Sequence, residues 1–133
     1  MKSLKKSVAQ LVAEARQVVT TLSVDDARAL ADDASELFVD IRDVRELQQQ
    51  GTIPDAFHAP RGMLEFWVDP ESPYYKPKLG DCERLVLFCQ SSWRSALAAK
   101  ALSDMGVTVA HIDGGFKAWK EAGAPIVEVG RRD

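Results

Sequence analysis

Apolar and polar positions along the chain predict helices that alternate with short strands. Near the start, apolar side chains recur at the intervals of an amphipathic helix: Leu4, Val8, Leu11, Val12 and Ala15. Residues 18–22 follow as a short extended piece. Ser23, with an acid three positions on at Asp26, has the pattern of a helix N-cap and predicts a helix that ends near Ala31.

Three apolar runs predict strands, at residues 37–41, 84–88 and 107–112, and a weaker strand is expected around Phe57. Near-continuous apolar strands of this kind are buried on both faces, as in a parallel sheet. We therefore expect an α/β fold with a central parallel sheet of about five strands, helices on both faces and right-handed crossovers.

Helices are expected between and after these strands. Asp43 followed by Glu46 has the spacing of a capping box, and residues 95–105 place apolar side chains on one helical face. A last helix should follow the glycine pair at 114–115. Residues 62–79, rich in proline and aromatic residues, are expected to form a long connection with a short helix or two.

The composition is that of one globular domain without an excess of positive charge. The 133 residues include 17 Lys and Arg against 20 Asp and Glu, with no dense cationic run, so nucleic acid is not an expected partner. No apolar stretch approaches the roughly 18 residues of a membrane span, and the start lacks a secretory segment. We expect a cytoplasmic protein with no membrane partner. The lysine-rich start also fits a transit peptide, but an amphipathic terminal helix is the preferred interpretation.

The chain has two cysteines, Cys82 and Cys89, and two histidines, His58 and His111. Their spacings match no metal-ligand pattern, so neither a metal nor another cofactor is expected. Both histidines are interpreted as structural because neither has a partner at catalytic spacing. Cys82, in a loop before a strand, is interpreted as incidental, with a second reactive thiol as the alternative.

The segment from Cys89 to Ser95 begins where the clearest strand ends and finishes where a helix begins. In open α/β sheets this crevice is where ligands bind. The helix N-terminus and a loop curled around the sulfur would direct backbone N–H groups at one point, a cradle that favours an anion. An ordinary thiol is only about 3% ionised at pH 7, so this cradle, together with the nearby Arg94 guanidinium, would favour the reactive thiolate.

This loop resembles the active-site loop of the rhodanese sulfurtransferases, in which a cysteine carries a sulfur atom as a persulfide. Three further segments resemble motifs of that family, in the family's order. Residues 40–42 (Asp-Ile-Arg) are similar to its Asp-x-Arg, and residues 51–56 (Gly-Thr-Ile-Pro-Asp-Ala) to its Gly-His-Ile-Pro-Gly-Ala turn. Residues 112–119 closely match its C-terminal signature. Each motif is weak alone, but the order and spacing together are specific.

The resemblance implies domain boundaries and a reaction. Residues 22–127 would form a single rhodanese-like domain, with residues 1–21 a helical extension packed on it and residues 128–133 a C-terminal tail. Cys89 would take a sulfane sulfur from thiosulfate, or from a glutathione or protein persulfide, and pass it to a thiophilic acceptor such as cyanide or a thiol. A thioredoxin-like protein is one candidate partner.

Cys89 and Arg94 are the predicted catalytic residues, and Arg94 would hold the loop closed and attract an anionic donor. The expected substrate-binding residues are Gln90, Ser91, Ser92, Trp93 and Ser95, the last of which would also cap the helix. Arg42 and Arg61 would bring positive charge near the loop, with Asp40 holding one of them. Structural ion pairs are the alternative for these three residues.

The sequence departs from the family pattern at two places. Thr52 and Asp55 replace the usual His and Gly of the turn, which leaves its local geometry open. Residues 90–93 are uncharged, whereas members specialised for thiosulfate often carry cations there. Thiosulfate is therefore not the preferred natural donor. Phe66 and Trp67 either cover the site or pack the long connection.

Two other functions are alternatives. Phosphatases and arsenate reductases of a related fold separate their cysteine and arginine by five residues, whereas four separate Cys89 from Arg94. The smaller loop suits a single sulfur atom, and no acid follows Cys89 in the loop to protonate a leaving group. The second alternative is a non-catalytic module that senses persulfide or binds a partner.

Overall fold

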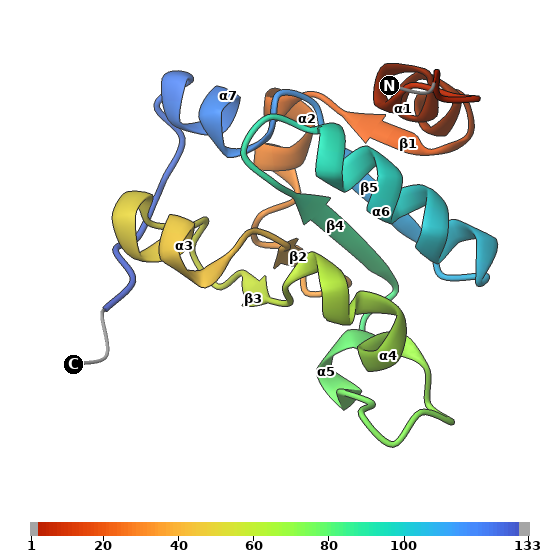
Figure 1. Ribbon diagram of the computed structural model, residues 1–133. Helices are drawn as coiled ribbons and strands as arrows, with labels where there is room; N and C mark the ends of the chain where they lie inside the picture. Colours follow the sequence, from red (N-terminus) through yellow and green to blue (C-terminus); the bar gives the residue numbers. More distant parts are fainter. Residues whose placement is uncertain (1–2, 131–133) are drawn as a thin grey trace.

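The computed structural model describes residues 3–130 and is built around one parallel sheet (Figure 1). Its five strands lie in the order β1-β5-β4-β2-β3, and every neighbouring pair is parallel. The strands are Thr20–Leu22 (β1), Glu36–Asp40 (β2), Phe57–His58 (β3), Arg84–Phe88 (β4) and Val109–Ile112 (β5). The predicted α/β fold with a five-stranded parallel sheet is confirmed.

Helices occupy the connections between the strands, and one helix precedes β1 and another follows β5. They are Val8–Val18 (α1), Val24–Ala29 (α2), Val44–Gln50 (α3), Arg61–Met63 (the 3-10 helix η1), Leu64–Val68 (α4), Pro77–Gly80 (α5), Trp93–Asp104 (α6) and Gly115–Glu121 (α7). The predicted start of α2 is confirmed, because the Ser23 hydroxyl accepts a hydrogen bond of 3.1 Å from the Asp26 amide. The predicted start of α3 is confirmed too, since Asp43 and Glu46 form a capping box. Each cap satisfies backbone N–H groups that have no partner inside the helix.

The hydrophobic core is divided between the two faces of the sheet. Successive side chains of a strand point to opposite faces. In β4, Leu85 and Leu87 join one cluster with residues of α4, α5 and α6, whereas Val86 and Phe88 join a second with residues of α2 and α7. Helices therefore cover both faces of the sheet, as predicted.

The register of the central strands brings three segments of the chain to one edge of the sheet. In the pairing of β2 with β4, Asp40 lies opposite Phe88, and in the pairing of β4 with β5, Leu87 lies opposite His111. The segments that follow Asp40, Phe88 and Ile112 consequently emerge together. In an open α/β sheet this carboxyl edge is the expected position of a ligand site.

The N-terminal helix α1 packs against α6. Its buried Val12 and Ala15 form a small cluster with Ala96, and Leu97 lies at the edge of that cluster. β1, which spans the predicted boundary between residues 21 and 22, is an edge strand of the sheet paired with β5. The division of the chain into extension, domain and tail stays a prediction, and parts of it, residues 1–2 and 131–133, lie outside the described residues. Within residues 3–130, no helix is long and apolar enough to cross a bilayer.

The turn before β3 keeps a defined geometry despite its two departures from the family pattern. The Thr52 hydroxyl donates a hydrogen bond of 2.7 Å to the Asp40 carboxylate. Asp55, at the position of the family's glycine, has a φ of 64°. This left-handed conformation suits glycine best, but aspartate tolerates it better than most residues. The aspartate thus adopts the conformation that the turn requires.

The long connection of residues 62–79 contains α4 and α5, as predicted, and its aromatic residues pack among themselves or on the sheet edge. Trp67 makes an edge contact with Phe57, and Phe66 makes one with Tyr74. Lys76 lies 5.2 Å from the centre of the Trp67 ring. These contacts favour the interpretation that Phe66 and Trp67 pack the long connection rather than cover the site. Figure 1 places α5 near the start of β4, whereas Cys89 follows the end of that strand.

Candidate active site

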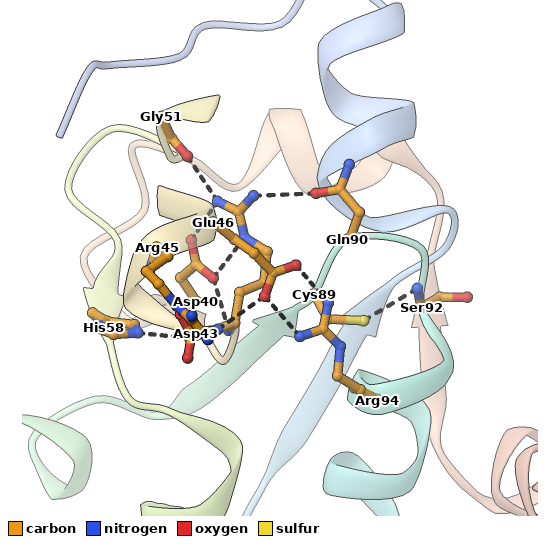
Figure 2. Close-up of polar contacts among 11 residues, drawn as sticks. Asp40, Asp43, Arg45, Glu46, Gly51, His58, Cys89, Gln90, Ser92 and Arg94 are labelled. Carbon is orange, nitrogen blue, oxygen red and sulfur yellow. Dashed lines mark hydrogen bonds and ion pairs between the residues drawn. The ribbon is translucent and has the colours of Figure 1, made fainter. Parts of the chain in front are cut away.

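Cys89 follows the last residue of β4 and is held inside the loop that leads to α6. Only 1% of the residue is exposed. The amide nitrogen of Ser92 lies 3.2 Å from its sulfur, so this N–H is directed at the thiol (Figure 2). Ser92 reaches this position with a φ of 121°, a conformation rarely adopted by residues that carry a Cβ. One N–H of the loop is therefore directed at the sulfur, whereas the predicted convergence of several N–H groups stays a prediction.

The start of α7 closes the loop from its other side. The Phe116 amide donates to the Cys89 carbonyl at 2.8 Å, and the Lys117 amide donates to the Gln90 carbonyl at 3.0 Å. Gly115 makes this approach feasible: a Cβ there would lie 2.5 Å from the Cys89 carbonyl oxygen. The segment recognised in the sequence as a C-terminal signature thus serves as a backbone clamp on the cysteine loop.

Arg94 lies beside Cys89, but its guanidinium is bound by Glu46 of α3 (Figure 2). Two hydrogen bonds of 2.9 Å join the two side chains. The hydrogen bond to Glu46 is the main reason that the pKa of Arg94 is raised, and Cys89 adds to the effect. In turn, the hydrogen bond from Arg94 holds the pKa of Glu46 below its ordinary value. This pair ties the start of α6 to α3, which gives the predicted loop-closing role of Arg94 a structural basis.

Arg42 is fully buried and forms the polar centre beneath the loop. Its guanidinium donates to both oxygens of Asp40, at 3.0 and 2.8 Å, and to the Gly51 carbonyl at 2.7 Å. A fourth bond, of 3.2 Å, reaches the Gln90 side-chain oxygen, and the Phe116 ring centre lies 4.3 Å from the guanidinium carbon. Asp40 therefore holds Arg42, one of the two predicted possibilities. Because four of its five N–H donors are taken by these partners and the side chain is fully buried, Arg42 positions Gln90 rather than binding a free anion.

The remaining predicted loop residues differ in exposure. Ser91 and Trp93 are exposed, with 49% of Trp93 accessible, and Gln90 is half-buried. That these three residues contact a donor stays a prediction. Ser95 is fully buried, and its prediction as the helix cap is wrong, because α6 begins two residues earlier at Trp93. Its hydroxyl donates instead to the Ser92 carbonyl at 3.1 Å and so supports the loop from below.

His111 lies behind the loop and takes part in the same network. Its Nδ1 is 3.0 Å from the Ser95 hydroxyl, and its Nε2 is 3.0 Å from the Thr21 hydroxyl. Since the Ser95 proton goes to the Ser92 carbonyl, Nδ1 carries the histidine proton and Nε2 accepts from Thr21. Burial lowers the pKa of His111 to about 4, and the nearby charge of Arg16 adds to this effect. The neutral ring thus acts structurally, as predicted, but its partner is the cysteine loop.

For two candidates from the sequence, the contacts that the structure shows do not include the Cys89 thiol. Arg61 pairs with Glu65 of its own segment at 2.8 Å, which favours the structural interpretation. Cys82 precedes β4 whereas Cys89 follows it, so about 16 Å of strand separates the two thiols. Burial raises the pKa of the Cys82 thiol. Its sulfur contacts the Leu79 carbonyl, which favours the incidental interpretation.

Sequence reasoning missed Arg16 and Glu46 as neighbours of the loop. Glu46 was noticed only for its place in a capping box, and the same carboxylate also binds Arg94. Arg16 lies at the end of α1 and donates to the Ser92 hydroxyl at 3.4 Å and to Asp113 at 3.0 Å. Neither contact has a signal in the sequence, because each depends on how separate helices pack.

The site offers a thiol, one backbone N–H directed at it and nearby positive charge. Within residues 3–130, no group of three or more His, Cys, Asp or Glu side chains comes together as metal ligands would. A cysteine in such a loop can act as a nucleophile whose anionic product is stabilised by backbone N–H groups.

Comparisons with known proteins agree with this arrangement. One solved structure is of a Rhodopseudomonas palustris protein of unknown function, described as a possible tyrosine phosphatase. It is 45% identical to this chain with a TM-score of 0.91, and the match covers 96% of this chain and 98% of that one. The polysulfide-sulfur transferase homodimer of Wolinella succinogenes is 31% identical with a TM-score of 0.67, over 89% of this chain and 85% of that one. An uncharacterized Synechocystis protein is 31% identical over 118 residues, which are 88% of this chain but only 61% of that protein's length.

The family model for the rhodanese-like domain matches residues 23–122, from the N-cap of α2 to the end of α7. This segment contains β2 to β5, the cysteine loop and the α7 clamp. The chain therefore belongs to the rhodanese-like domain family.

Proposed function

We propose that this protein is a sulfurtransferase that carries a sulfane sulfur on Cys89 as a persulfide. The observation that supports the proposal most directly is the Ser92 amide, 3.2 Å from the Cys89 sulfur in a loop clamped by α7. This geometry stabilises negative charge on a sulfur atom at the end of β4. The similarity to the Wolinella succinogenes polysulfide-sulfur transferase points to the same chemistry.

The transfer is a double displacement. The Cys89 thiolate attacks the outer sulfur of a donor such as thiosulfate, the sulfur–sulfur bond of the donor breaks, and sulfite leaves with the electron pair. The outer sulfur of the resulting Cys89 persulfide carries the negative charge. A thiophilic acceptor such as cyanide then attacks that sulfur, leaves as thiocyanate, and restores the thiolate. Glutathione or protein persulfides as donors and thiols as acceptors follow the same scheme.

Phosphatase chemistry is the second candidate, because a relative 45% identical to this chain is described as a possible tyrosine phosphatase. Two features of the loop disfavour it. Only four residues separate Cys89 from Arg94, and the Arg94 guanidinium is engaged by the Glu46 carboxylate. A phosphate dianion would have to displace Glu46 to be bound by Arg94.

The deciding experiment weighs the intact protein by mass spectrometry after incubation with thiosulfate, and separately with glutathione persulfide. We expect a gain of one sulfur, about 32 Da, that dithiothreitol releases and that Cys89→Ser lacks. Cys82→Ser is the matched control and should gain the same mass. No gain with either donor would contradict the proposal.

Two further measurements separate the alternatives. Hydrolysis of an aryl phosphate that depends on Cys89 would favour the phosphatase function. For the non-catalytic module, a partner protein captured equally well by wild-type protein and by Cys89→Ser, without persulfide formation, would favour binding alone.

A further inference from the structure

The end of α1 brings a cationic side chain to the cysteine loop. One guanidinium nitrogen of Arg16 lies 3.4 Å from the Ser92 hydroxyl, and another lies 3.0 Å from the Asp113 carboxylate. The Arg16 side chain is 36% exposed and that of Asp113 is 57% exposed. Arg16 thus contacts the residue whose amide is directed at the cysteine sulfur, while about a third of its side chain stays exposed to solvent.

Packing fixes Arg16 in this place. Ala15, the preceding residue, is fully buried with Val12 against Ala96 of α6, the helix that begins at the loop. Because α1 and α6 share this contact, the last turn of α1 cannot move away from the loop without opening an apolar cluster. Arg16 also precedes residues 23–122, the segment that matches the family model.

The charge balance around the loop distinguishes Arg16 from the other nearby guanidinium groups. Arg94 is bound by two hydrogen bonds to Glu46, and Arg42 is buried against Asp40. Among residues 3–130, Arg16 has a single ion pair, with a carboxylate that is more than half exposed, and such surface pairs are weak. An incoming anion can therefore take the place of Asp113 at low cost. The charge of Arg16 also acts on the buried His111, because it contributes to lowering the pKa of that residue.

We propose that Arg16 binds the anionic group of the sulfur donor, and that the site consequently selects small anionic sulfane-sulfur donors such as thiosulfate. This inference rests on the proposed function. The sulfonate of thiosulfate is one bond from the sulfur that Cys89 attacks, so a cation at the Ser92 side of the loop is placed to hold it. After the sulfur–sulfur bond breaks, the same guanidinium holds the leaving sulfite. Residues 90–93 carry no charge, and α1 supplies the cation that they lack.

The first test measures anion binding at the loop without relying on sulfur transfer. The rates of Cys89 alkylation by iodoacetate, which is anionic, and by iodoacetamide, which is neutral, are compared by peptide mass spectrometry. For Arg16→Gln we expect the iodoacetate rate to fall about three- to tenfold, with the iodoacetamide rate within twofold of wild type. Arg16→Lys should keep most of the iodoacetate rate, and added salt should reduce the wild-type preference.

For two further variants we expect, respectively, a faster reaction with iodoacetate and no change with either reagent. Asp113→Asn removes the competing carboxylate, so the iodoacetate rate should rise about two- to fivefold. Lys78→Gln removes one positive charge from α5, by the start of β4, and should change neither rate. Equal losses with both reagents in Arg16→Gln would overturn the inference, because they would show that Arg16 only shapes the loop. An unchanged iodoacetate rate would overturn it as well.

The second test follows the rate of Cys89 persulfide formation against thiosulfate concentration. Arg16→Gln should raise the thiosulfate concentration needed for half-maximal rate about three- to tenfold, with a smaller change in the maximal rate. If wild-type Cys89 gains sulfur normally and Arg16→Gln matches it at every concentration, the donor assignment fails while the proposed function stands. If Cys89 forms no persulfide with any donor, the proposed function fails, and the alkylation ratio alone still reports whether Arg16 binds anions.

Discussion

The Ser92 amide nitrogen lies 3.2 Å from the Cys89 sulfur, and Ser92 adopts a φ of 121° to place it there. A residue with a Cβ pays about 1–3 kcal/mol for such a conformation. The surrounding structure holds it in place: the Ser92 carbonyl accepts from the Ala96 amide at 2.9 Å and from the Ser95 hydroxyl at 3.1 Å. Backbone strain is thus located at the residue whose amide is directed at the Cys89 sulfur.

Replacing Ser92 tests this strain. Ser92→Gly and Ser92→Ala both lose the hydroxyl that contacts Arg16, but only alanine keeps a Cβ. We expect Ser92→Gly to have a free energy of unfolding about 1 kcal/mol higher than Ser92→Ala, because relief of strain exceeds the entropic cost of glycine. Urea unfolding of the two variants measures the difference. Equal stabilities would show that the position is unstrained.

The clamp between α7 and the loop requires a glycine at position 115. In Gly115→Ala, the new Cβ would meet the Cys89 carbonyl oxygen at 2.5 Å and the Gln90 carbonyl at 2.8 Å. We expect a loss of about 2–4 kcal/mol in the free energy of unfolding and slower persulfide formation, because the two hydrogen bonds from α7 to the loop would be strained.

Gly123→Ala is the matched control for this variant. Gly123 also has a positive φ, of 75°, but a Cβ there would meet nothing within 4 Å. The free energy of unfolding of Gly123→Ala should fall by only about 1–2 kcal/mol, and its rate of persulfide formation should be unchanged. If the two alanine variants were equally stable and equally active, the close approach of α7 would have no role.

Most of the fold could be predicted because its signals are local. The apolar run at residues 84–88 coincides with β4, and the caps at Ser23 and Asp43 are the caps that α2 and α3 use. The start of α6 was misplaced for a physical reason. Ser95 has the chemistry of a cap, but the chain already turns at Ser92, whose positive φ has no signature in its residue type.

From the pattern of the chain alone, the cysteine loop was predictable because its residues follow one another in sequence, and the resemblance to the rhodaneses added Asp40 and Arg42. Cys89 and its loop lie between a clear strand and a clear helix, so their position followed from the pattern. Glu46 and Arg16 reach the loop from α3 and α1, across 48 and 76 positions of the chain in the contacts with Arg94 and Ser92. Such contacts depend on the packing of helices, which the periodicity of a single segment does not encode.

The pair of Arg94 and Glu46 predicts non-additive effects on sulfur transfer. Arg94→Ala leaves the Glu46 carboxylate near the loop without its counter-charge, so persulfide formation with thiosulfate should slow about tenfold or more. Glu46→Gln, which can still accept the capping hydrogen bond from the Asp43 amide, should stay within about threefold of wild type.

A double-mutant cycle provides the control for that prediction. The double variant Glu46→Gln/Arg94→Ala should form persulfide about three times faster than Arg94→Ala alone, because the uncompensated carboxylate is removed. Stopped-flow measurement of persulfide formation in the four proteins gives the coupling. Strictly additive effects would indicate that Arg94 acts on Cys89 or the donor independently of Glu46.

His111 makes stability depend on pH in a defined window. The pKa of its imidazole is lowered to about 4 in the folded protein, chiefly by burial and further by Arg16, whereas an unfolded histidine titrates near 6.5. The unfolded chain therefore binds a proton first as the pH falls. The stability associated with the neutral ring is complete above about pH 6.5 and is lost between about pH 6.5 and 4, by up to about 3 kcal/mol.

His111→Gln isolates this contribution, since glutamine cannot be protonated in that range. We expect the free energy of unfolding of the wild type, relative to the variant, to be constant above about pH 7 and to fall steadily from pH 6.5 to 4.5. Urea unfolding at four pH values across this range measures the difference, and the carboxylates common to both proteins cancel. A difference that does not change with pH would mean that His111 titrates alike in the folded and unfolded chains. In that case, protonation of the ring would not be what destabilises the folded chain at low pH.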